Sequence, residues 1–234
     1  MTILIRIWKF FAYSIGALAL AFILVQAWVL AHILYWDRYN PGGTNFMERR
    51  LDGLRAKNGK AQLKYRWVDY ERISTHLKHA VIAAEDAKFI DHEGFDWEGI
   101  QRALEKNLRR GKVVAGGSTI SQQLAKNLFL SGERSLVRKG EEAIITLMLE
   151  TVMSKRRILE LYLNVAEWGE GVFGAEAAAR HYYGVAAANL SAEQAARLAA
   201  MLPRPGFYDR NRGSRYLAEY SERILVRMPS AQVP

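Results

Sequence analysis

The sequence contains no cysteine among its 234 residues. This absence excludes disulfide bonds and any mechanism that needs a thiolate. No Ser-x-x-Lys tetrad occurs either, so the signature of penicillin-binding transpeptidases is missing. Segments in which apolar and polar residues alternate are scarce, which argues against a domain built on strands. We therefore expect a mainly α-helical protein without thiol chemistry.

Charged residues are also missing from residues 10–36, which read FFAYSIGALALAFILVQAWVLAHILYW. At about 1.5 Å per residue, a helix of this length exceeds the roughly 30 Å hydrocarbon core of a bilayer. We expect a transmembrane helix at 10–36, preceded by a cytoplasmic N-terminus at 1–9 that carries Arg6 and Lys9. A cleaved signal peptide is the alternative, but its apolar region is usually only about 7 to 15 residues long.

Basic residues outnumber acidic ones, and the formal net charge is +9. This charge indicates an anionic partner, and nucleic acid, anionic lipid and phosphorylated substrates all qualify. Because the part of the chain after the membrane helix is expected to be exported, nucleic acid is disfavoured. Residues 37–64 are polar, basic and contain glycine, so we expect a juxtamembrane stem there, followed by a globular domain at 65–234.

Carboxylates crowd residues 83–96, where a helix expected at about 74–87 ends. Desolvating an unpaired carboxylate is costly, so Glu85 and Asp86 should face a wet cleft or hold partners. Charges that are merely solvated at a helix end are the alternative. His92 follows these acids closely and could hydrogen-bond a carboxylate or a backbone carbonyl, which would fix the loop.

The residues after this loop predict an amphipathic helix at about 96–109, followed by a glycine-containing loop at 111–117. The apolar residues at helical spacing are Trp97, Ile100, Leu104 and Leu108. An ordinary surface helix with a flexible loop is one interpretation. The other is a basic, apolar flap that rests on the membrane surface and admits a lipid-linked substrate.

A helix start is predicted at residues 116–122, where two glycines precede Thr119-x-x-Gln122, the pattern of a capping box. Backbone donors at such a start favour anions or sugar hydroxyls. Gln123 and Lys126 lie three residues apart, so both can project from one face beyond the cap. Ser191-x-x-Gln194 predicts a second capping box further along the chain.

Arg134, Arg138 and Glu142 recur every four residues in a helix expected at about 134–153, and therefore lie along one stripe. A row of exposed ion pairs along the helix surface, each worth a few tenths of a kcal/mol, is one interpretation. Two guanidinium groups beside a carboxylate would also suit a departing diphosphate. The residues of this helix expected to face the core are Leu136, Ile144, Leu147 and Met148.

Four blocks in this order match a known family. They are Glu85-Asp86-x-x-Phe89-x-x-His92-x-Gly94, Gly116-Gly117-Ser118-Thr119-Ile120-Ser121-Gln122-Gln123, Arg138-Lys139-x-x-Glu142, and Lys155-x-x-Ile158-Leu159-Glu160-x-Tyr162-Leu163-Asn164. The chain thereby resembles the peptidoglycan glycosyltransferases of glycosyltransferase family 51, over roughly residues 65–205. In size and layout it looks like the monofunctional members of Gram-negative bacteria. Ser121 departs from the pattern, because threonine is more usual there.

The resemblance implies a lysozyme-like, mainly α-helical glycosyltransferase domain behind one transmembrane helix. It implies polymerisation of lipid II onto a growing glycan strand, with inversion at the anomeric carbon and release of undecaprenyl diphosphate. The implied location is the bacterial inner membrane, with the catalytic domain in the periplasm, and cell-wall synthesis proteins are potential partners. No cofactor is certain, and a divalent cation, Mg²⁺ or Mn²⁺, near the diphosphate stays open.

The resemblance also assigns roles to single residues. Glu85 matches the general base, and Glu142 matches a second acid that assists departure of the diphosphate, positions other groups or helps to hold a metal ion. The residues expected to contact or position the substrate are Asp86, Phe89, His92, Ser118, Thr119, Gln123, Lys126, Arg134, Arg138 and Asn164. Of these, Lys126, Arg134 and Arg138 match positions close to the diphosphate.

Two other classes of function stay open. A lysozyme-like or lytic hydrolase would use a similar acid-bearing helix and cleft, but cutting the polymer needs no diphosphate site. A catalytically silent, membrane-anchored scaffold of the cell wall would tolerate the loss of Glu85 and Glu142 together. The cluster of lysine and arginine residues favours the transferase.

Overall fold

The computed structural model describes residues 2–112, 116–130 and 135–234, so Arg134 and part of the predicted loop at 111–117 lie outside the described residues. The chain divides into two compact units, Met1–Tyr39 and Asn40–Pro234. The first unit is the helix α1 (Thr2–Arg38), which contains the predicted span 10–36. Within the described part of the chain, α1 alone is long and apolar enough to cross a membrane.

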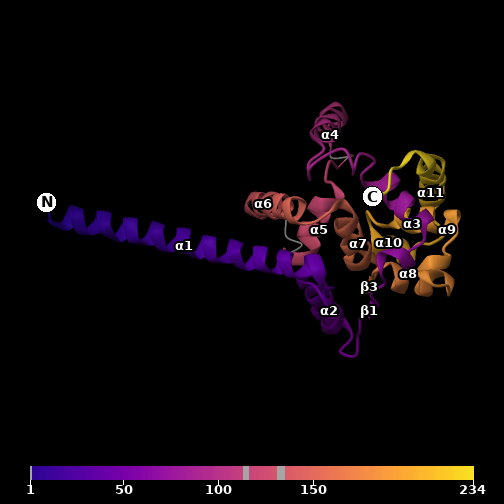
Figure 1. Cartoon of the computed structure of the whole chain (residues 1–234), viewed down its shortest axis with the longest axis horizontal. Coiled ribbons are helices and arrows are strands. Elements are labelled where there is room, and N and C mark those ends of the chain that lie inside the picture. Colours follow the sequence, from indigo (N-terminus) through magenta and orange to yellow (C-terminus); the bar gives the residue numbers. More distant parts are fainter. Residues whose placement is uncertain (1, 113–115, 131–134) are drawn as a thin grey trace. The chain divides into compact units, whose positions relative to one another are not determined.

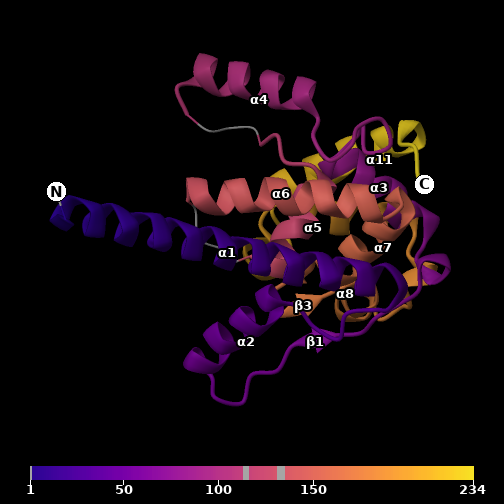
Figure 2. The same ribbon diagram turned by 60° about the vertical axis from the view of Figure 1, so that its left-hand side comes forward.

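The second unit is mainly helical, as predicted (Figures 1 and 2). Its α-helices are α2 (Asn45–Lys57), α3 (Thr75–Glu85), α4 (Trp97–Arg110), α5 (Ile120–Phe129), α6 (Leu136–Val152), α7 (Lys155–Val165), α8 (Ala175–Tyr183), α9 (Ala192–Met201), α10 (Pro205–Arg210) and α11 (Arg215–Arg227). A small sheet has the order β1-β3-β2, formed by β1 (Lys64–Tyr65), β2 (Glu167–Gly169) and β3 (Val172–Phe173). Strand β3 pairs parallel to β1 and antiparallel to β2.

Helix starts follow the local chemistry of the sequence. Both predicted capping boxes are present, at Thr119 before α5 and at Ser191 before α9. Asp96 caps α4 through a bond from the Gly99 N–H to its side chain. Ser74 stands before α3 as expected, but its hydroxyl donates to the Leu190 carbonyl at 3.0 Å instead of capping the helix.

The core lies where α3 packs on α9 and α11, and where α5 packs on α6 and α7. Its largest fully buried side chains are Trp168, Tyr162, Phe89 and Phe173. Helix α3 is held by residues such as Leu77 and Val81, which are both completely buried. Because α3 and α5 are both fixed by this packing, the C-terminal end of α3 has a defined position beside α5.

The expected stem, 37–64, contains a helix that the sequence analysis did not predict. This helix, α2, begins at a Thr44 cap and packs against α5. Arg50 pairs with Glu167 at 2.5 Å, and the Asn45 side chain donates to the Phe129 carbonyl at 3.1 Å. The part of the stretch from Asn40 onwards therefore belongs to the second unit.

The predicted core face of α6 was wrong for Leu136 and Leu147, while Ile144 and Met148 are half-buried. Leu136 is 92% exposed and Leu147 is 53% exposed, whereas Ile145 and Leu149 are buried. The buried residues of α6 are Glu142, Ile145, Thr146 and Leu149, which form a stripe at the spacing i, i+3, i+4 and i+7. Apolar residues surround much of α6, so spacing alone did not identify the face that meets α5.

Helix α4 presents its apolar residues to the outside. Trp97, Leu104 and Leu108 are 71%, 57% and 73% exposed. Both ribbon views show α4 at the periphery of the second unit (Figures 1 and 2). The predicted apolar face of this helix therefore exists, and the described part of the chain leaves it largely uncovered.

Candidate active site

Glu85 is the last residue of α3, and its carboxylate is held by a short chain of hydrogen bonds. The Gln123 side-chain amide donates to Glu85 Oε2 at 2.8 Å, and the Tyr162 hydroxyl donates to Gln123 Oε1 at 3.0 Å. Tyr162 thus fixes the orientation in which Gln123 turns its NH₂ group towards the carboxylate. Burial raises the pKa of Glu85, while the Gln123 hydrogen bond and the Lys126 charge act in the opposite direction.

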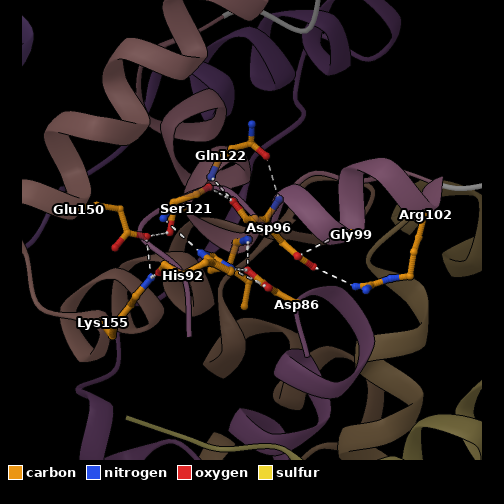
Figure 3. Close-up of polar contacts among 12 residues, drawn as sticks. Asp86, His92, Asp96, Gly99, Arg102, Ser121, Gln122, Glu150 and Lys155 are labelled. Carbon is orange, nitrogen blue, oxygen red and sulfur yellow. Dashed lines mark hydrogen bonds and ion pairs between the residues drawn. The ribbon is translucent and has the colours of Figure 1, made fainter. Parts of the chain in front are cut away.

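Asp86 connects the end of α3 to the start of α5 (Figure 3). Its buried carboxylate accepts from His92 Nε2 at 3.0 and 3.1 Å and from the Ile120 N–H at 2.9 Å. The Gly94 N–H donates to His92 Nδ1 at 3.1 Å, so the imidazole proton lies on Nε2. The predicted bond between His92 and a carboxylate is confirmed.

The loop between these elements is held at two further points. Gly94 has φ +89°, a left-handed conformation that a residue with a Cβ rarely adopts, and its carbonyl accepts from Thr119 Oγ1 at 2.7 Å. The Thr119 hydroxyl also caps α5. Thr119 therefore contributes to the site by fixing the backbone, and it is almost fully buried.

A second network, which the sequence analysis missed, supports the same loop from α5, α6 and α7 (Figure 3). Glu150 accepts from the Ser121 hydroxyl and from Lys155 Nζ, the latter at 2.8 Å. Lys155 Nζ also donates to the His92 carbonyl at 2.5 Å and lies 4.7 Å from the centre of the Phe89 ring. Lys155 is the first residue of the fourth sequence block, and this position was the signal from which its role could have been predicted.

Glu142 is not part of an exposed row of ion pairs. Its side chain is buried and pairs with Arg138 at 2.6 Å and with Lys139. Lys126 is half-buried, and its side chain forms no hydrogen bond or ion pair with the described residues. Burial lowers the pKa of Lys126, Glu142 and Glu85 both raise it, and Arg138 lowers it further. Lys126 therefore lies within the electrostatic reach of both acids.

Two cavities adjoin these side chains. One, of 510 Å³, is lined by Gln123, Lys126 and Tyr162 together with basic residues that include Arg204 and Arg210. The other, of 260 Å³, is lined by Glu85, Asp86, Ser118 and Thr119. The bond from Gln123 to Glu85 links the linings of the two cavities. Both Gln123 and Lys126 face one cavity, as their spacing predicted.

Other predicted site residues lie elsewhere. Phe89 and Asn164 are completely buried, and the Asn164 amide bonds to the Val68 backbone at 2.9 Å in both directions. Asn164 thus connects α7 to the segment before α3. His92, Arg138 and Glu142 line neither cavity, although His92 bonds to Asp86, which lines the smaller one.

The carboxylates of the described residues do not form a chelating group. Among residues 2–112, 116–130 and 135–234, no three His, Asp or Glu side chains lie close enough to hold a metal ion. Both Glu142 oxygens already face cations. A Mg²⁺ or Mn²⁺ ion held partly by phosphate oxygens of a substrate stays a prediction.

Comparison with known proteins adds a second line of argument. A family model described as Transglycosylase matches residues 52–229. The chain is 65% identical over 213 residues to the biosynthetic peptidoglycan transglycosylase of Dechloromonas aromatica, covering 91% of this chain and 92% of that protein. It is 59% identical over 227 residues to the protein of the same name in Nitrosospira multiformis, covering 97% of each.

Proposed function

The chain belongs to the transglycosylase family, and from this premise we infer that it is a peptidoglycan glycosyltransferase of cell-wall synthesis, anchored to a membrane. We propose that it polymerises lipid II onto a growing glycan strand, with inversion at the anomeric carbon and release of undecaprenyl diphosphate. The proposed location is the bacterial inner membrane, with the N-terminus in the cytoplasm and the catalytic domain in the periplasm.

Glu85 is proposed as the general base. It would take the proton from the 4-hydroxyl of the acceptor sugar as that oxygen bonds to the anomeric carbon and the bond to diphosphate breaks. A positioned carboxylate contributes about 10² to 10⁴ in rate. The observation that carries this proposal is the Glu85–Gln123–Tyr162 chain, which holds a carboxylate of raised pKa at the edge of a cavity.

Lys126 is proposed to stabilise the departing diphosphate. It is a half-buried cation without an ion pair among the described residues, and it faces the larger of the two cavities of the site. Well-placed charges of this kind act where the transition state gains charge. We propose that Glu142 positions Arg138 and Lys139, because it already pairs with both.

The test is Glu85→Gln in the full chain, assayed with labelled lipid II in detergent. We expect the rate of polymerisation to fall by at least about 10². Because burial raises the Glu85 pKa, ionisation costs stability above that pKa, so the variant should keep or gain thermal stability at pH 8. Glu93→Gln removes an exposed carboxylate from the same loop and serves as the matched control.

Substantial polymer from Glu85→Gln would refute the assignment of the base. The assay also separates the alternatives. A hydrolase would release fragments from preformed glycan and make no polymer from lipid II. A scaffold would show neither reaction, and its variants would behave like the unaltered protein.

A further inference from the structure

A series of aromatic rings runs across α10 and α11. The ring centres of Phe207 and Tyr208 are 5.2 Å apart, those of Tyr208 and Tyr216 are 6.5 Å apart, and those of Tyr216 and Tyr220 are 5.9 Å apart. The planes of Tyr208 and Tyr216 differ by only 7°. Tyr208 is buried, whereas Tyr216 is 55% exposed and Phe207 is 39% exposed. A buried ring thus lies between two exposed ones.

These rings line two further cavities. Tyr216 and Tyr220 border both a cavity of 410 Å³, with Phe207 and Tyr208, and a cavity of 1020 Å³ between α4 and α11. Each of these cavities shares a lining residue with the candidate active site. Phe207 also lines the 510 Å³ cavity that holds Lys126, and Arg227 also lines the 260 Å³ cavity that holds Glu85.

Tyr220 also connects the rings directly to the catalytic helix. Its hydroxyl donates to the carbonyl of Ala84, the residue before Glu85, at 3.3 Å. Burial raises the Tyr220 pKa, and the negative charge of Glu85 raises it further. The aromatic series therefore ends beside the proposed base.

The surroundings of the rings favour a sugar over a lipid chain. A pyranose has a face of C–H groups that suits the negative face of an aromatic ring, and hydroxyls around its edge that need donors and acceptors. Charged groups of both signs line the larger of these two cavities, and the basic ones outnumber the acids: Lys106, Arg110, Arg223 and Arg227 against Glu219 and Glu222. An acyl chain would leave these charges unsatisfied.

We propose that Tyr216, Tyr220 and Phe207 form a saccharide-binding track that holds N-acetylhexosamine units of the glycan strand away from the bond being formed. This inference rests on the proposed function and adds a second place at which the same polymer is bound. Contact along the track keeps the strand on the protein between successive additions, and so lengthens the product.

The direct test measures binding of a lipid-free hexamer of N-acetylglucosamine to the full chain in detergent micelles, by saturation-transfer NMR and titration. We expect the unaltered protein to bind, and Tyr216→Ala to weaken binding by about two- to tenfold. Tyr216→Phe keeps the ring and should bind nearly as well as the unaltered protein. Tyr183→Ala removes a tyrosine that does not line these two cavities and is the matched control.

A second measurement uses lipid II and compares the length of the strands made. We expect shorter strands from Tyr216→Ala than from Tyr216→Phe, at equal thermal stability of the two variants. Failure of the unaltered protein to bind the hexamer, or equal binding and equal strand lengths for Tyr216→Ala, would overturn the proposal. If the unaltered protein makes no polymer, the proposed function fails, and the hexamer titration still decides whether the rings bind saccharide.

Discussion

The raised pKa of Glu85 predicts the pH dependence of the reaction. A general base must be ionised, so activity is lost as pH falls through its pKa, and burial places this loss above the usual pKa of 4.5 for glutamate. Lys126 lowers the Glu85 pKa, so Lys126→Met should move the acidic limb of the profile to higher pH. The pH profile of kcat/KM for lipid II polymerisation checks this, and an unmoved limb in the variant would contradict it.

Asp86 is predicted to act through structure, because its carboxylate accepts from both His92 and the first N–H of α5. Asp86→Ala leaves two buried donors without partners, and we expect a loss of about 1–3 kcal/mol in the free energy of unfolding. Asp86→Asn should also be destabilising, since the NH₂ group that replaces one carboxylate oxygen cannot accept a hydrogen bond. Urea denaturation measures this loss, with the exposed Asp91→Asn as the control. Equal stability of all four proteins would show that the hydrogen bonds contribute little.

Several side chains of the site could be predicted from sequence, because their chemistry is local. The Asp86–His92 pair lies within one loop, and the Thr119 capping box lies within one turn. Tyr162 could not be identified in this way, since it occurs in an apolar helical run that resembles ordinary core. Its hydroxyl gains a role only because α7 packs against α5 and brings it to Gln123.

At the level of the elements, the two capping boxes form a matched pair. Thr119 is buried and starts the helix that carries Gln123 and Lys126, whereas Ser191 is exposed and starts α9. Each change to alanine should cost about 0.5–2 kcal/mol of stability. Only Thr119→Ala should also reduce polymerisation beyond the effect of lost stability. The substitution removes the hydrogen bonds that hold the start of α5 and the Gly94 loop. Thermal denaturation and lipid II assays on both variants check this, and equal activity losses would contradict it.

The helices themselves were predictable to within a few residues, because caps and apolar spacing are encoded locally. The face that each helix packs against its neighbours was harder to predict. Helix α6 carries leucine or isoleucine around much of its surface, and the face containing Ile145 was selected by contact with α5. Helix α2 was missed because its sequence is polar and basic, and its docking depends on partners such as Glu167, far away in the sequence.

At the scale of the whole molecule, both α1 and α4 carry exposed apolar side chains. The exposed apolar residues of α1 fit a membrane span, and those of α4 fit the second interpretation of this helix, a flap at the membrane surface. The described part of the chain leaves Leu104 and Leu108 exposed at a free-energy cost that burial among lipids would remove. An enzyme whose substrate is embedded in lipid needs such contact.

The orientation of the chain in the membrane can be tested because the sequence has no cysteine. Single cysteines placed at Thr2 and at the exposed Ser230 would report the two sides of the membrane. Arg6 and Lys9 favour a cytoplasmic N-terminus, so a membrane-impermeant maleimide should label Ser230→Cys in intact spheroplasts and Thr2→Cys only after permeabilisation. The reverse pattern would place the Glu85 site in the cytoplasm, away from the proposed periplasmic site of glycan synthesis.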